Sequence, residues 1–246
     1  MHDSFHKETA KYIGIMGKEE GDHYRAMEGS SMDNGTQGNN TVFLAGTVVS
    51  VPQYSHNVCG EGFYTLRLEV PRLSGYCDVL PITVSERLLE CICADKGRML
   101  NVCGQLRSYN RCIGGSNRLL LTVFAKDLQQ AGEQAHTPNE ITLEGFICKP
   151  PTYRTTPFGR EIADIMLAVN RSYGKSDYIP CICWGRNARY AASLQVGEKI
   201  RVYGRVQSRE YEKALADGES ETRTAYEVSV CQIERVCPAT KEKTET

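Results

Sequence analysis

The chain has 246 residues, 29 basic and 30 acidic side chains, and a formal net charge of −1. This balance excludes a protein that attracts nucleic acid through a high overall positive charge, so any basic surface has to be local. A length of 246 residues exceeds the usual size of one compact domain and predicts two small ones.

The 11 cysteines are an odd number, and no two of them form a C-x-x-C pair. The sequence has no apolar N-terminal signal segment and no apolar run long enough to cross a bilayer. We therefore expect a reduced, cytoplasmic protein with no membrane association.

The first 38 residues are rich in glycine, serine and charged side chains and show no apolar periodicity. Such a composition cannot offset the entropy lost on ordering, so residues 1–38 are predicted to form a disordered tail. Residues 237–246 are predicted to form a short C-terminal tail.

An internal repeat begins at Asn40, because an offset of 99 positions places NTVFLAG onto NEITLEG at Asn139. A repeat of this length in two copies indicates a duplicated domain, with residues 39–128 and 139–236 as the copies and 129–138 as the linker. The same offset, increased by one residue after position 96, matches Pro52 with Pro151, Tyr54 with Tyr153, Gly60 with Gly159, Val70 with Val169, Arg72 with Arg171, Gly75 with Gly174, Asp78 with Asp177, Pro81 with Pro180, Gly97 with Gly197, Val102 with Val202, Gly104 with Gly204 and Ser108 with Ser208.

The sequence of each copy predicts five strands and one helix, because segments with alternating β-branched residues are separated by glycine and proline. An all-β protein with two tandem five-stranded OB-fold barrels accounts for this order, and an unrelated small β-barrel is the alternative. In the second copy the strands are expected at about 140–149, 161–170, 177–184, 198–208 and 224–235, with a helix capped by Asn187 at about 187–194 and a weaker helical segment at 86–93 in the first copy.

Catalysis is not indicated by any cluster of reactive side chains. Glu161 and Asp164 lie three residues apart on a predicted strand and face opposite sides. General acid–base catalysis needs side chains that point toward the same site. The glycines that follow Ile113 lie in a predicted hairpin rather than before a helix, so they are not a phosphate loop. The five histidines lie mostly in the predicted tail, loop or linker: His2, His6, His23, His56 and His136. We predict that the protein is not an enzyme.

Two Cys-x-Cys pairs, Cys91/Cys93 and Cys181/Cys183, have residue types that bind zinc. On a strand, however, this spacing points both thiols to one face, where cysteine serves as a small buried apolar residue. We predict no metal site and no cofactor.

Aromatic and basic side chains interleave between Val169 and Lys213. On the third strand of the second copy, Tyr178, Pro180, Ile182 and Trp184 share one side, and Ile179, Cys181 and Cys183 share the other. The cysteine side is expected to face the core, which leaves Tyr178 and Trp184 on an outward face where unstacked bases can stack. The alternative is that such rings only pack, and this is the interpretation we favour for Tyr153, Tyr190 and Tyr203.

The segment Thr156–Glu212 closely resembles the bacterial single-stranded DNA-binding proteins of the OB fold, and the likeness extends over 139–235. Its motifs are TPFG at Thr156, LAVNR at Leu167, DYI at Asp177, WG at Trp184 and GRVQSREY at Gly204. The resemblance implies stacking positions at Tyr173, Tyr178, Trp184 and Tyr211. It also implies phosphate contacts from basic side chains, nominated by type and position as Arg154, Arg171, Lys175, Arg186, Arg205 and Arg209.

The chain also departs from this family's pattern. Members usually end in an acidic tip that recruits repair and replication enzymes, whereas this chain ends CPATKEKTET, so that recruitment is not expected. In the first copy the positions of Tyr173, Tyr178 and Trp184 are occupied by Ser74, Val79 and Ser85, and the nearby aromatic candidates are Tyr76 and Tyr109. We therefore expect the first copy to keep the barrel and to lose much of the stacking surface.

The predicted function is binding and protection of single-stranded DNA in replication, recombination or repair, with little sequence specificity. Binding of RNA, a primosomal accessory role, or a protein–protein adaptor role are the alternatives left open by the sequence. A homodimer is expected, since the resemblance implies assemblies of four OB domains, and association with the bacterial nucleoid in the cytoplasm follows from the same resemblance.

Overall fold

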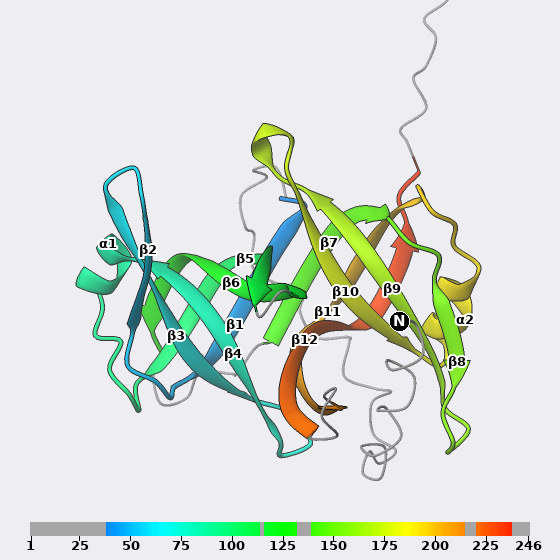
Figure 1. Ribbon diagram of the computed structural model, residues 1–246, viewed down its shortest axis with the longest axis horizontal. Helices are drawn as coiled ribbons and strands as arrows, with labels where there is room; N and C mark the ends of the chain where they lie inside the picture. Colours follow the sequence, from blue (N-terminus) through cyan, green and yellow to red (C-terminus); the bar gives the residue numbers. More distant parts are fainter. Residues whose placement is uncertain (1–37, 114–115, 132–138, 215–219, 238–246) are drawn as a thin grey trace, which may run out of the picture.

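The computed structural model describes residues 38–113, 116–131, 139–214 and 220–237, which form two similar β-barrels (Figure 1). We call 38–131 the first half and 139–237 the second half. The first half contains β1 (Asn40–Val48), β2 (Gln53–Val58), β3 (Glu61–Pro71), β4 (Cys77–Ser85), α1 (Glu86–Glu90), β5 (Met99–Ile113) and β6 (Ser116–Gln130). The second half contains β7 (Asn139–Ile147), β8 (Thr152–Thr155), β9 (Glu161–Asn170), the 3-10 turn η2 (Ser172–Gly174), β10 (Ser176–Trp184), α2 (Arg186–Ala192), β11 (Lys199–Ala214) and β12 (Ser220–Arg235).

Each half closes into a five-stranded barrel. In the second half β7 pairs with both β9 and β11, and β10 pairs with β9 and, in parallel, with β12, so that β7, β9, β10, β12 and β11 form a ring. The first half repeats this ring with β1, β3, β4, β6 and β5. Two tandem OB-fold barrels were predicted, and that prediction is confirmed. The expected N-terminal tail and most of the expected linker and C-terminal tail lie outside the described residues, although β6 continues to Gln130.

One short strand in each half was not predicted. β2 pairs along one edge with β3, and β8 pairs likewise with β9, in segments that were expected to be loops. Every residue of β2 is exposed, and β8 has only Arg154 half-buried. The apolar alternation that identifies a half-buried strand is therefore absent from both segments.

The helices are shorter than expected and are capped differently. α1 ends at Glu90, so Cys91 and Cys93 are exposed rather than buried on a strand, and the prediction of two core thiols there is wrong. α2 is capped by Gly185 in a positive-φ conformation of 52°, not by Asn187. The Asn187 side-chain amide instead donates to the carbonyl oxygen of Cys231 at 2.7 Å and so ties the helix to β12.

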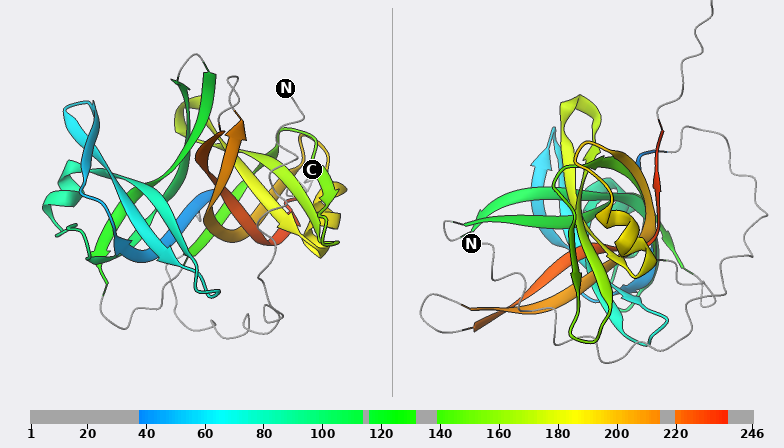
Figure 2. Two further views of the ribbon diagram at one scale, coloured as in Figure 1. Left: turned by 60° about the horizontal axis from the view of Figure 1, so that its bottom comes forward. Right: turned by 90° about the vertical axis from the view of Figure 1, so that its right-hand side faces the viewer.

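The last two strands of the second half are longer than predicted. β11 and β12 stay paired from Ile200 and Arg235 out to Ala214 and Ser220, well beyond the barrel. This hairpin and its first-half counterpart, β5–β6, project in the same direction in the right-hand view of Figure 2, in orange and green respectively. A projecting hairpin has few apolar side chains, so its strands lack the pattern that predicts them.

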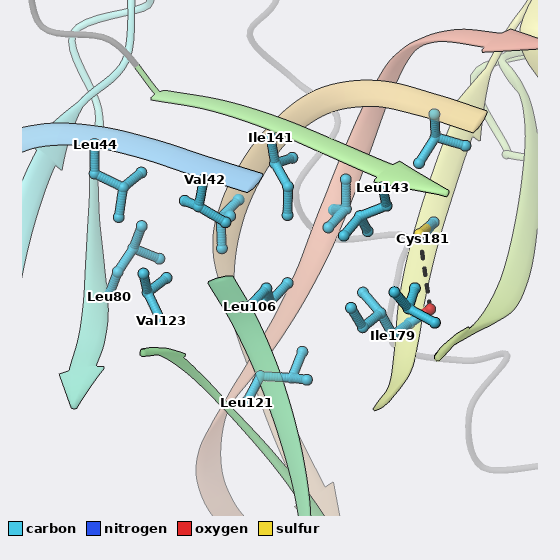
Figure 3. Packing of buried hydrophobic residues seen from close by; sticks show 14 of the residues in the cluster. Val42, Leu44, Leu80, Leu106, Leu121, Val123, Ile141, Leu143, Ile179 and Cys181 are labelled. Carbon is cyan, nitrogen blue, oxygen red and sulfur yellow. Dashed lines mark hydrogen bonds between the residues drawn. The ribbon is translucent and has the colours of Figure 1, made fainter. Parts of the chain in front are cut away.

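The buried side of the third strand is as predicted. Ile179, Cys181 and Cys183 are at most 2% exposed and face the core shown in Figure 3. Burial raises the pKa of the Cys183 thiol to about 12, which keeps it neutral and apolar in character. Ile182, expected to face outward, is only 4% exposed.

The two halves share one continuous sheet. β1 and β7 pair antiparallel, with Val42 opposite Ile141, which is its own equivalent in the repeat. A pseudo-twofold axis therefore passes through this pair, and each half meets the other through equivalent residues. Gly46 and Gly145 allow close crossings, because a Cβ at these positions would strike the backbone carbonyls of Glu69 and Ala168.

Candidate nucleic-acid interface

Two exposed tyrosines mark the outer face of the second barrel. Tyr178 lies near the start of β10 with 44% of its surface exposed. Tyr173 lies in η2, which joins β9 to β10, and is fully exposed. Its backbone φ of 63° is in the left-handed region, which a bulky residue rarely adopts. The exposed Lys175 follows in the same turn, two residues after Tyr173 and three before Tyr178.

The other end of β10 carries Trp184, which is half-buried. Its Cα partner on β9 is Ile162, whose partner on β8 is Arg154, so Arg154 and Trp184 belong to one row across three strands. Arg154 is engaged with Asp164, with its Nη2 3.0 Å from the carboxylate. Arg186 is exposed at the first position of α2, directly after this row.

Arg171 has a different set of contacts from the one predicted. Its guanidinium forms a two-pronged hydrogen bond with the carboxylate of Asp177 and donates to the carbonyl oxygen of Ser108 at 2.9 Å. Asp177 is fully buried, and the Arg171 side chain is only 19% exposed. The hydrogen bond to Asp177 raises the pKa of Arg171 above its ordinary value. A phosphate contact from Arg171 stays a prediction, but the residue first of all holds the halves together.

Asp177 also holds two residues of the first half. Its carboxylate accepts from the Ser108 backbone N–H at 2.5 Å and from Arg107 Nη1 at 3.0 Å. The Ser108 hydroxyl in turn accepts from the backbone N–H of Tyr178 at 2.8 Å. We call Arg171, Asp177 and Ser108 the second clamp, because they fix the first-half hairpin against the start of β10.

The first clamp is its pseudo-symmetric equivalent and consists of Arg72, Asp78 and Ser208. Arg72 pairs with the fully buried Asp78 and donates to the carbonyl oxygen of Ser208 at 3.0 Å. The Ser208 backbone N–H and hydroxyl donate to Asp78 at 2.6 and 3.1 Å. Sequence reasoning missed the clamps, although all three residue pairs were matched in the repeat. Identical polar residues in two otherwise diverged copies were the signal.

Two asparagines that are equivalent in the repeat, Asn40 and Asn139, each bind a neighbouring strand of their own half. The Asn40 side chain donates to the Leu106 carbonyl at 2.7 Å and accepts from its N–H at 2.9 Å. The Asn139 side chain makes the same two bonds to Val206, at 2.8 and 2.9 Å. Each amide thus satisfies the backbone N–H and C=O of one residue on a neighbouring strand.

Three of the predicted positions lie on β11 rather than beside Tyr173 and Tyr178. Arg205 is half-buried, with Ser229 as its Cα partner. Arg209 lies 3.8 Å from Glu227 and 5.8 Å from the Tyr211 ring centroid. Tyr211 follows three residues after Ser208, which is bound to Asp78 of the first half. Tyr211 therefore belongs to the β11–β12 hairpin that crosses the first half. The structure therefore divides the predicted site between the outer face of β10 and this hairpin.

Phe146 is an exposed aromatic residue that sequence reasoning did not nominate. Its Cα partner on β9 is Ala168, which is itself the partner of Tyr178, so the three residues form one row across β7, β9 and β10. Phe146 is 38% exposed, which extends the aromatic surface by one strand. The alternation of Leu143, Gly145 and Ile147 as buried positions on β7 could have identified it.

The first-half positions equivalent to Tyr173, Tyr178 and Trp184 carry no ring, although Tyr76, 55% exposed, lies in the matching turn. Val79 is half-buried, and Ser85 caps α1 by accepting from the Leu88 N–H at 3.4 Å. Aromatic side chains gather instead on β2 and β3, where the rings of Tyr54 and Tyr64 meet edge to face at 5.7 Å. The Tyr64 hydroxyl donates to Glu86 at 3.3 Å, so this cluster is next to carboxylates rather than cations.

Within the described ranges, no group of three or more His, Cys, Asp and Glu side chains could hold a metal ion. No helix among the described residues has the length and apolar character needed to span a membrane.

The closed five-stranded barrels define an OB-fold protein. Residues 138–236 match the model of the single-strand binding protein family. The single-stranded DNA-binding protein B of Bacillus subtilis is 37% identical over 81 residues, which are 30% of this chain and 72% of that protein. The chain belongs to the single-strand binding protein family.

Two further similarities give the extent of this relation. The single-stranded DNA-binding protein 2 of Listeria innocua is 38% identical over 81 residues, 30% of this chain and 51% of that protein, so the chain spans about half the length of this relative. The wild-type single-stranded DNA-binding protein of Thermus aquaticus has a similar structure, with a TM-score of 0.66 at 22% identity over 81% of this chain and 93% of that one. At that identity the likeness concerns the fold alone, and it extends over both halves.

Proposed function

We propose that this protein binds single-stranded DNA on the outer face of β9 and β10 in the second half. The observation that carries the proposal is the group formed by Tyr173, Lys175 and Tyr178, in which two exposed rings and an exposed cation lie within six residues of the chain on an OB barrel. Unstacked bases offer π-faces to such rings while cations neutralise phosphates, and this combination binds single strands with little sequence preference.

The predicted residues have distinct roles in this proposal. Tyr173, Tyr178, Trp184 and Tyr211 stack bases, and the basic residues contact phosphates. Lys175 and Arg186 are exposed and can reach a phosphate without losing a contact, whereas Arg154, Arg171 and Arg209 each already contact a carboxylate. A contact from any of the three arginines therefore shares the cation between phosphate and carboxylate. The biological role that follows is protection of exposed strands in replication, recombination or repair.

The assembly we propose is a homodimer, which would contain four OB barrels. The continuous sheet through β5, β1, β7 and β11 offers one outer face that spans both halves. Phe43, 44% exposed, lies on this face next to the pseudo-twofold axis and is an apolar side chain that a second copy would cover. Light scattering at micromolar concentration should give twice the chain mass of 27.4 kDa, and a monomeric mass would contradict the dimer.

The test of the function is a titration of the protein with oligo-dT, followed through Trp184, the one tryptophan of the chain. We expect a change in its fluorescence, and an affinity that falls with salt at a slope of roughly −0.7 per phosphate contacted. Duplex DNA of the same length is the control and should bind far more weakly. No fluorescence change and no retention of oligo-dT on a filter would refute the proposal.

A competition experiment separates the proposed ligand from its alternatives. Stacking barely distinguishes DNA from RNA unless the 2′-hydroxyl is contacted, so matched DNA and RNA oligomers should be compared directly. Preferential displacement of oligo-dT by RNA would favour an RNA ligand. Failure to bind either oligomer, combined with stable co-purification of a protein partner, would support an adaptor.

A further inference from the structure

Tyr109 belongs to the first half by sequence but lies against the second half. It is on β5, and the guanidinium carbon of Arg171 lies 5.4 Å from its ring centroid. The ring is 42% exposed, close to the 44% of Tyr178. A large ring with this exposure, next to a cation at the edge of a proposed single-strand surface, has the properties of the residues already nominated there.

The backbone next to Tyr109 is fixed by the second clamp. Ser108 donates its N–H to Asp177 at 2.5 Å, accepts from Arg171 at 2.9 Å through its carbonyl, and accepts from the Tyr178 N–H at 2.8 Å through its hydroxyl. Successive residues of a strand point to opposite sides, so the buried Ser108 faces Asp177 and Tyr109 points away from it. The Tyr109 ring is thus held in a set position relative to the start of β10.

We infer that Tyr109 is a base-stacking residue of the second half's single-strand surface, supplied by the first half. This inference rests on the proposed function. The strand would continue from Tyr178 past Arg171 onto the β5–β6 hairpin, so the first half contributes to binding although it carries no ring at the positions equivalent to Tyr178 and Trp184. A clamped backbone also lowers the entropy that the ring loses when a base stacks on it.

The repeat shows that the position of Tyr109 is occupied differently in the second half. The residue equivalent to Tyr109 in the second half is Arg209, which follows Ser208 of the first clamp. At this position the second half therefore brings an arginine to the first half, and the ring on the same hairpin is Tyr211, two residues further along.

The competing explanation is that Tyr109 only packs on Arg171 and supports the clamp. Three full-length variants separate the two, Tyr109→Ala, Tyr109→Phe and Tyr54→Ala. Phenylalanine keeps the stacking face without the hydroxyl. Tyr54 is a matched control, because it is an exposed first-half tyrosine on β2, the edge strand that pairs only with β3.

The readout is the affinity for oligo-dT of about 35 nucleotides, which exceeds what two OB folds cover at roughly 4–16 nucleotides each. Tyr109→Ala should weaken binding by about five- to a hundredfold, with an unchanged salt slope, because a stacking face and not a charge is lost. Tyr109→Phe and Tyr54→Ala should stay within about threefold of the natural protein. A folded Tyr109→Ala variant with unchanged affinity, or one with a reduced salt slope, would overturn the inference.

Cross-linking gives a second readout that does not depend on a variant. Oligo-dT carrying 5-iodouracil, irradiated on the natural protein, should label the peptide that contains Tyr109 as well as peptides of the second half. Labelling confined to the second half would overturn the inference and leave the proposed function standing. If the natural protein does not bind oligo-dT at all, the proposed function fails and this inference fails with it.

Discussion

The two halves agree where they touch each other and differ where they face solvent. Both keep a buried aspartate with its arginine, Asp78 with Arg72 and Asp177 with Arg171. One residue further along the same strands, the first half has the half-buried Val79 and the second half has the exposed Tyr178. Each clamp uses the aspartate of one half to hold the hairpin of the other, so loss of either clamp would loosen the shared interface. The outer faces carry no such mutual constraint.

The helices show the same divergence in charge. α1 carries the exposed Glu86 and Glu90 beside one exposed arginine, Arg87, whereas α2 carries the exposed Arg186 and Arg189 and no acidic residue. The end of the second barrel therefore attracts a polyanion more strongly than the same end of the first. The net charge of −1 for the whole chain conceals this local difference.

The largest expected effect follows from breaking a clamp. Asp177→Ala and Asp78→Ala each leave an arginine that is about four-fifths buried without its carboxylate, and a Ser N–H without its acceptor. Breaking a buried pair in this way costs about 3–5 kcal/mol of unfolding free energy, to be measured by urea denaturation. In the folded fraction, Asp177→Ala should also weaken oligo-dT binding, because Asp177 holds the segment next to Tyr178.

Asp164→Ala is the control for this pair of variants. Asp164 also contacts an arginine, Arg154, but its side chain is 37% exposed. An exposed pair contributes at most about 1 kcal/mol, so the unfolding midpoint should barely move. Equal losses for Asp164 and the two clamp aspartates would show that the clamps have no special role.

The next largest effect concerns the rings that distinguish the second half. Tyr178→Ala and Trp184→Ala should each weaken oligo-dT binding by about 1–3 kcal/mol if a base stacks there. Val79→Ala, at the first-half position equivalent to Tyr178, should leave the affinity unchanged. Trp184→Ala removes the fluorescent reporter, so filter binding or calorimetry has to replace it. Unchanged affinity in both ring variants would make Tyr178 and Trp184 packing residues.

The barrels could be predicted because their signals are local. Alternation places Ile179, Cys181 and Cys183 on one side of a strand, and the repeat confirms the order of elements in the other copy. Exposed and projecting strands could not be predicted, since β8 and the outer part of β11 bury no regular set of apolar side chains. The wrong prediction for Cys91 and Cys93 has a related cause. Their two-residue spacing was interpreted as that of a strand, whereas both cysteines follow the end of the short helix α1.

The exposed part of the candidate site was predicted better than its charged part. Tyr173 and Tyr178 were named from parity and resemblance, and both are exposed. Arg171 was nominated for phosphate by residue type, which gives no information on the partner that a folded chain supplies. Asp177 is six residues away and Ser108 is 63, and only the fold brings both to Arg171. The separate domain limits, 39–128 and 139–236, stay a prediction.

A smaller effect should separate the equivalent asparagines of β1 and β7. Asn40 and Asn139 make equivalent pairs of hydrogen bonds, but Asn40 is 2% exposed and Asn139 is half-buried. Removing the Asn40 side chain leaves the N–H and C=O of Leu106 buried without hydrogen-bond partners. This loss costs about 1–3 kcal/mol of unfolding free energy. Asn40→Ala should therefore destabilise more than Asn139→Ala, where water can replace part of the loss. Equal denaturation midpoints would contradict the role of burial.

The smallest expected effect is the most direct test of where the strand runs. Lys175→Gln should lower the salt slope of oligo-dT binding by about 0.7, the amount for one phosphate on a single strand, and reduce affinity a few-fold. The equivalent first-half residue is Tyr76, 55% exposed in the matching turn. Tyr76→Lys places the same cation there and should leave the slope unchanged if the DNA passes from Tyr178 to the β5–β6 hairpin without reaching that turn. A slope that grows by about 0.7 would instead mean that the strand also crosses the first barrel, and the two halves would then differ in affinity rather than in function.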